Sequence, residues 1–154
     1  MKTLTPIEEE QQQYQESPQH SHAALIHLSS LVNYLGVPFG SVVGPLITWA
    51  IWRDEGKFTD ENGKEALNFN LSIMLYQVLA VIIGLFLFLS PILATASSGT
   101  DNPIGLILSI PGLGLFIGGI GFISIFRLIA VIVAAVKAGN GEIFHYPLSI
   151  RFIK

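Results

Sequence analysis

Hydrophobic residues are concentrated in three long stretches of the chain, which cover residues 23–52, 66–100 and 102–136. The first two stretches contain no Asp, Glu, Lys or Arg, and the third contains only Arg127. A helix that crosses a bilayer needs roughly 20 apolar residues, whereas a helix on the surface of a soluble domain carries polar residues along one face. The pattern therefore predicts an all-α, polytopic membrane protein with three to four membrane segments.

The first apolar stretch is divided by a turn. Ser17-Pro18 is typical of a helix start, so we expect a helix over 17–35. Residues 36–40 contain one proline and two glycines, which interrupt a helix, and a short second helix is expected over 41–52. The segment is either one kinked span or a short helical hairpin. We favour the hairpin, because such a turn is more than a kink requires.

The other two stretches each predict one long helix, over 63–93 and 103–136. A polar loop is expected at 53–65, and Gly139-Asn140-Gly141 is typical of a helix end. The predicted organisation is a disordered tail at 1–16, a helical membrane domain at 17–138 and an interfacial C-terminal tail at 139–154. The first of these is polar and short of apolar anchors, as disordered segments are.

The distribution of lysine and arginine predicts the orientation. Basic residues gather in the polar loop and after the last helix: Arg53, Lys57, Lys64, Lys137, Arg151 and Lys154. The loop at 97–102 has none. Since cytoplasmic loops carry an excess of Lys and Arg, we expect a bacterial inner-membrane protein with a cytoplasmic C-terminus. The N-terminus lies inside in the hairpin alternative and outside in the kinked-span alternative.

Composition excludes several classes of function. The chain is 51% hydrophobic and 12% charged, with no cysteine and a net charge of −3, against about 25% charged residues in a typical soluble domain. The absence of cysteine excludes disulfides and thiolate chemistry, and the absence of a basic patch argues against nucleic acid. Hydrolase motifs and paired intramembrane carboxylates are absent from the sequence. We therefore expect a protein that is not an enzyme and needs no cofactor.

Histidine offers no strong metal site. His20 and His27 lie seven residues apart on one face of the first expected helix, while His22 points elsewhere. Two imidazoles without a nearby carboxylate make a weak metal site. We interpret these residues as polar groups at a membrane boundary and expect no bound metal.

Arg127 is the most costly residue of the apolar stretches, at about 2.5–3.5 kcal/mol at the centre of a bilayer. If the long helices are antiparallel and level, Tyr76 and Gln77 lie at the same depth and form a polar cluster with it. Alternatively, Arg127 extends its side chain to the membrane surface. A small transporter or channel would use the first arrangement.

The last helix is rich in glycine, and Gly114, Gly118 and Gly121 lie along it at helical spacing. Small residues let the backbones of membrane helices approach each other closely. We expect these glycines to serve helix packing.

Five short strings occur in a characteristic order: His27-Leu-Ser-Ser-Leu31, Val43-Gly-Pro-Leu-Ile-Thr-Trp49, Gly63-Lys-Glu-Ala-Leu-Asn-Phe69, Ala138-Gly-Asn-Gly-Glu142 and Tyr146-Pro-Leu148. Together, over about residues 22–154, they resemble a family of small bacterial membrane proteins related to the twenty-kilodalton inner-envelope component of the chloroplast protein-import machinery. The resemblance implies a helical membrane domain linked to protein translocation, without catalytic residues. The expected function is a non-enzymatic structural or assembly role in a translocation or envelope complex, with the bilayer and a membrane protein as partners.

Overall fold

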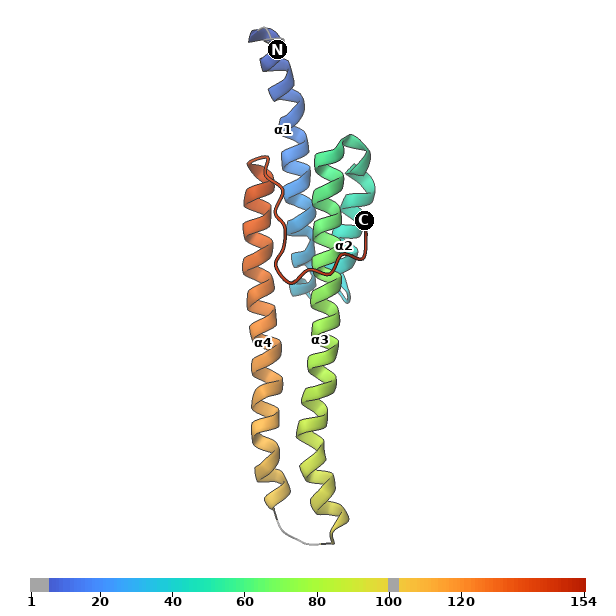
Figure 1. The fold of residues 1–154 in the computed structure, drawn as a ribbon, viewed down its shortest axis with the longest axis vertical. Helices are drawn as coiled ribbons and strands as arrows, with labels where there is room; N and C mark the ends of the chain where they lie inside the picture. The colour runs from blue at the N-terminus through green and yellow to red at the C-terminus, as the bar shows by residue number, and fades with distance from the viewer. Residues whose placement is uncertain (1–5, 100–102) are drawn as a thin grey trace. The chain divides into compact units, whose positions relative to one another are not determined.

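A computed structural model describes residues 6–99 and 103–154, with side chains from residue 18 onward, and every regular element in these ranges is helical. The α-helices are α1 (Pro6–Ser29), α2 (Gly40–Trp52), α3 (Lys57–Ser97) and α4 (Ile104–Gly139) (Figure 1). Two short 3₁₀ helices, η1 (Ser30–Leu35) and η2 (Arg53–Glu55), follow α1 and α2. The prediction of an all-α fold is confirmed.

The residues divide into two compact units. The first unit comprises Met1–Ser72 with Leu128–Lys154, and the second comprises Ile73–Arg127. The first therefore contains α1, α2, the start of α3, the end of α4 and the residues that follow α4, 140–154, which we name the C-terminal segment. The second contains the apolar remainder of α3 and α4.

Two helices, α3 and α4, are long and apolar enough to cross a membrane. Only 6% of the most apolar window of α3 and 28% of that of α4 is buried within the chain. The core helix of a soluble protein would be mostly buried, so these apolar surfaces suit contact with lipid. Three to four membrane segments were expected. Within the described residues, two helices, α3 and α4, have the length and composition of a membrane-spanning segment.

The short hairpin expected near residues 36–40 is present in the first unit, where α1 and α2 pack against each other. Gly36 takes a left-handed φ of 83°, which favours glycine and lets the chain reverse direction. A Cβ on Gly44 would collide with the backbone oxygen of Ser29, so glycine permits this close approach. Ser29 Oγ and Thr48 Oγ1 also share a hydrogen bond of 3.2 Å.

Two expected boundaries were wrong. Because α1 begins at Pro6, Ser17-Pro18 lies inside the helix and residues 6–16, expected to be a disordered tail, are helical; residues 1–5 lie outside the described residues. The expected polar loop at 53–65 is helical from Lys57 onward. In this helical part, residues of opposite charge lie four positions apart. Lys57 forms an ion pair of 3.4 Å with Glu61, and Lys64 forms one of 2.7 Å with Asp60. Such pairs stabilise a helix.

Within the second unit, small residues bring α3 and α4 together. A Cβ on Gly112 would lie 2.8 Å from the backbone of Leu87, and one on Gly84 would collide with the ring of Phe116. A Cβ on Gly105 would collide with Thr95. These glycines therefore allow the two helices to pack closely, as small residues do between membrane helices.

Candidate functional site

The first unit is organised around a buried histidine of α1. His27 is fully buried, and its Nε2 lies 3.0 Å from Asn62 Oδ1 of α3. The amide nitrogen of Asn62 donates to the carbonyl of Phe58, so its oxygen faces the imidazole and Nε2 is the donor. The other ring nitrogen, Nδ1, therefore accepts a hydrogen bond of 2.9 Å from the hydroxyl of Tyr146.

Burial keeps this imidazole neutral. Desolvation is the largest effect and lowers the pKa of His27 from 6.5 to about 4. The hydrogen bond that its Nε2 donates to Asn62 and the charge of Glu65 act in the opposite sense and raise the pKa. Tyr146 also stacks on Phe69 of α3, with ring centroids 4.0 Å apart. His27 and Phe69 thus anchor the start of the C-terminal segment in the core.

The end of the C-terminal segment is held by two polar side chains of α3. Asn68 Oδ1 accepts hydrogen bonds from the backbone N–H groups of Phe152 (3.0 Å) and Ile153 (2.8 Å), and Asn68 Nδ2 donates to the carbonyl of Ile153 at 2.9 Å. One turn further on, Ser72 Oγ accepts from the N–H of Ile150 at 2.8 Å. Because all of these bonds go to the backbone, they fix the path of the segment whatever its side chains are.

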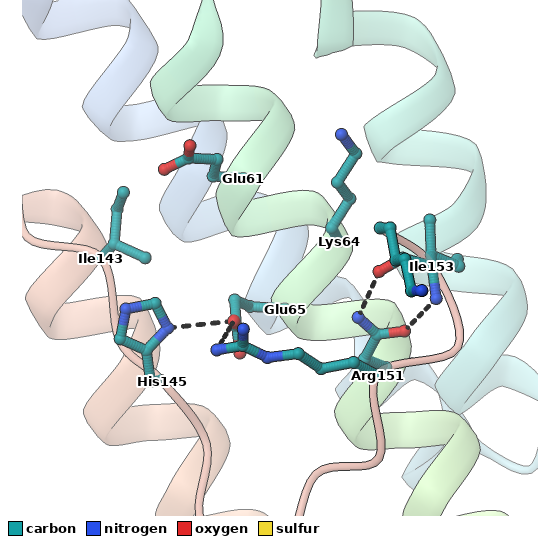
Figure 2. Close-up of a pocket in the computed structure, with 9 residues that line it drawn as sticks. Glu61, Lys64, Glu65, Ile143, His145, Arg151 and Ile153 are labelled. Atoms are coloured by element: carbon teal, nitrogen blue, oxygen red, sulfur yellow. Dashed lines mark hydrogen bonds and ion pairs between the residues drawn. The ribbon is translucent and has the colours of Figure 1, made fainter.

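A pocket of about 340 Å³ lies where this segment passes α3 (Figure 2). Glu65 stands at its centre, 3.0 Å from His145 Nδ1 and 3.8 Å from a guanidinium nitrogen of Arg151. Lys64, Lys154 and Glu61 also line it. The pocket combines both signs of charge, and no group of three or more His, Cys, Asp or Glu suited to a metal ion occurs in the part of the chain that the structure describes.

A second pocket shares Lys64, Ile153 and Lys154 with the first and adds Arg53 and Lys57. Trp49 and Asp60 also line the second pocket, and the Trp49 indole donates a hydrogen bond of 2.9 Å to Asp60. Basic residues of the 53–64 region and of the C-terminus thus gather in one place in the first unit.

The predicted polar cluster lies in the second unit. Arg127 is 2% exposed there, while Tyr76 and Gln77 are partly buried. This burial agrees with the alternative in which Arg127 faces protein. Its pairing with Gln77, and the transporter or channel function that depends on it, stay predictions.

The glycines predicted to serve helix packing have no such role within the described chain. A Cβ on Gly114, Gly118 or Gly121 would meet no atom within 4 Å, whereas one on Gly84, Gly105 or Gly112 would collide with a neighbour. The regular spacing of these glycines shows that they share a face of α4, but it does not show whether that face contacts α3.

Sequence reasoning missed the residues that hold the C-terminal segment. Asn68 and Ser72 interrupt a stretch of mostly apolar residues, and a buried polar group needs a hydrogen-bond partner; this was the available signal. His27, Asn68, Phe69 and Tyr146 also belong to the short strings singled out above, and the structure brings these strings together in the first unit.

Fold and site together define an α-helical membrane protein whose C-terminal segment is fixed to a polar helical unit by backbone hydrogen bonds. A model of the magnetosome magnetite crystal formation protein family matches residues 18–153, and the chain belongs to this family. No curated protein and no solved structure matches it.

This assignment corrects the resemblance drawn from the short strings. The chain matches the magnetosome family over residues 18–153, so its relation to a component of the chloroplast import machinery was wrong. The strings mark contacts inside a helical fold, and fold-level likeness does not identify a function. The role in protein translocation is withdrawn with it.

Proposed function

We propose that this protein is a non-enzymatic structural component of the membrane in which magnetite crystals form. The family match over residues 18–153 and the two apolar helices support this proposal. The observation that carries the structural part is the use of the buried polar side chains. His27, Asn68 and Ser72 each bind another part of the same chain, which is what a scaffold requires of them.

The basic residues support one orientation. Lys64 and Lys154 line both pockets, while Arg151 lines the first and Arg53 and Lys57 line the second. The basic residues around the start of α3 and those of the C-terminus therefore lie together. Because cytoplasmic loops are enriched in Lys and Arg, the number of these residues favours the cytoplasmic side for both. In this proposal α3 and α4 cross the membrane, and the turn between them faces the opposite side.

Complementation tests the function. The chain would be expressed in a magnetite-forming bacterium from which its own members of this family have been deleted, with an unrelated two-helix membrane protein as control. We expect the protein in the magnetosome membrane fraction and a shift of crystal size towards that of the undeleted strain, measured by electron microscopy. Crystals unchanged despite correct localisation would overturn the proposal.

Cysteine labelling tests the orientation, and the absence of native cysteine makes it direct. Single cysteines at Asp54, Ser98 and Asn140, all exposed positions, would be treated in intact cells with a thiol reagent that does not cross membranes. We expect labelling of Ser98→Cys alone. Labelling of Asp54→Cys or Asn140→Cys from outside would contradict the proposed orientation.

A further inference from the structure

The end of the C-terminal segment, residues 147–154, exposes apolar side chains while its backbone is fixed. We name these residues the C-terminal strap. Ile150 is 40% exposed, Phe152 52% and Leu148 70%, although Asn68 and Ser72 hold the backbone of the strap on α3. Disordered tails also expose apolar groups, but a strap bound at several backbone groups presents them in one direction.

The strap is bound where the character of α3 changes. The charged residues of α3 end at Glu65, Ser72 binds the strap, and from Ile73 onward the helix is dominated by apolar side chains. In the proposed function this part of α3 enters the bilayer, so the strap lies at the level of the lipid headgroups. Apolar side chains fixed at that level gain free energy by entering the boundary between headgroups and acyl chains.

The charge of the strap suits the same surface. Arg151 and Lys154 line the pocket of Figure 2 and are both exposed. Arg151 lies near Glu65, whose carboxylate also binds His145, and Lys154 forms no ion pair with any residue that the structure describes. Clustered cations near apolar anchors attract anionic lipid headgroups.

We propose that the C-terminal strap is an interfacial lipid-binding element. Ile150 and Phe152 enter the boundary between headgroups and acyl chains, while Arg151 and Lys154 bind the phosphates of anionic phospholipids. This inference rests on the proposed membrane insertion of α3 and α4, so its test must separate a failure of the strap from a failure of insertion.

Spin labels on the full chain in vesicles of phosphatidylcholine and phosphatidylglycerol make this separation. Labels would be placed at Ile150→Cys and Phe152→Cys, with Phe86→Cys on α3 and Asn140→Cys after α4 as references. The substitutions keep the strap bonded to α3, because its hydrogen bonds there involve backbone groups of the strap. Collisions with oxygen report lipid, and collisions with a water-soluble nickel complex report solvent.

We expect strap labels to give an oxygen-to-nickel ratio between those of Phe86→Cys and Asn140→Cys. A water-exposed label at Phe86 would overturn the membrane insertion itself. A lipid-exposed label at Phe86 with strap labels that match Asn140→Cys would overturn the strap proposal alone. Strap labels shielded from both reagents would indicate a protein partner and would also overturn it.

The matched variants Lys154→Gln and Lys137→Gln test the anionic headgroup. Each removes one positive charge, but Lys137 pairs with Glu142 at 3.1 Å and lines neither pocket. Adding phosphatidylglycerol should reduce the mobility of the Phe152→Cys label in the parent and in Lys137→Gln, and this shift should be lost in Lys154→Gln. An equal response of the two variants, or no response of the parent, would overturn the assignment of anionic lipid.

Discussion

The two units of this protein hold their helices together by different means. In the first unit, buried polar side chains such as His27, Asn62 and Asn68 bond to one another or to backbone. In the second unit, small residues such as Gly84, Gly105 and Gly112 let α3 and α4 approach each other. A buried hydrogen-bond network fixes one arrangement of the helices, but only if every donor and acceptor in it has a partner. Packing at small residues requires only that no side-chain atom fills the space between the two helices.

The difference shows where each unit is vulnerable. A buried hydrogen-bond network loses stability when one member is removed, because the remaining partner stays buried and unsatisfied. A close helix contact loses stability when one atom is added, because neither backbone can move away without cost. Substitutions that remove atoms test the first unit, and those that add atoms test the second.

The largest effect is expected at Gly44, which lies in the first unit but, unlike the rest of that unit, is tested by adding an atom. Gly44 packs against the backbone of Ser29, so Gly44→Ala forces α1 and α2 apart. We expect a loss of about 3 kcal/mol in the free energy of unfolding, at the upper end of the cost of overpacking. Denaturant titration in detergent measures it, with Gly139→Ala, where a Cβ meets no atom within 4 Å, as control. Equal stability of the two variants would contradict this contact.

A second test uses pH to break the network at His27. Because burial lowers the pKa of His27 from 6.5 to about 4, the unfolded chain binds a proton at this site before the folded chain does. The stability contributed by neutral His27 is thus complete above pH 6.5 and is lost as the pH falls to about 4, on the order of 3 kcal/mol in total. The slope of stability against pH should be smaller in His27→Gln. Parallel slopes would show that His27 titrates normally.

Removing one amide should release the C-terminal strap without unfolding the unit. Asn68→Ala deletes three hydrogen bonds to Phe152 and Ile153, which we expect to cost about 2 kcal/mol of local stability. Trypsin cleavage after Arg151 should then accelerate on the order of thirty-fold, since cleavage follows the open population. Asn140→Ala, at an exposed position, is the control, and equal cleavage rates would contradict the clamp.

Much of the helical framework could be predicted from the apolar pattern. The expected helices at 41–52, 63–93 and 103–136 correspond to α2, α3 and α4, with shifted ends. The start of α3 was missed because a segment dense in charge was interpreted as a loop. Its charges in fact pair along the helix, as Lys64 does with Asp60, so spacing of opposite charges was the better indicator.

The candidate site could not be predicted in the same way. Asn68 and Ile153 are separated by 85 residues, and neither carries a local signal that identifies the other. Asn68 bonds to the backbone of Phe152 and Ile153, and every residue type except proline offers the same backbone groups, so the sequence of the C-terminal segment does not reveal these bonds. The buried amides in an apolar stretch could have indicated that a partner exists, but its identity follows from the three-dimensional arrangement alone.

The smallest expected effect separates the two groups of glycines in α4. Gly112→Ala adds a Cβ that would lie 2.8 Å from the backbone of Leu87, and we expect a net loss of about 1 kcal/mol after the gain in helix propensity. Gly118→Ala adds a Cβ that meets no atom within 4 Å, so only the gain of propensity, about 1 kcal/mol, should remain for the monomer. Denaturant titration of both variants in dilute detergent, where a single chain is measured, would compare them. If Gly118→Ala lost stability there, the face of α4 that carries Gly118 would pack within the single chain, contrary to the open space that the structure shows at this position. If it lost stability only at high protein concentration, that face would pack against a second copy.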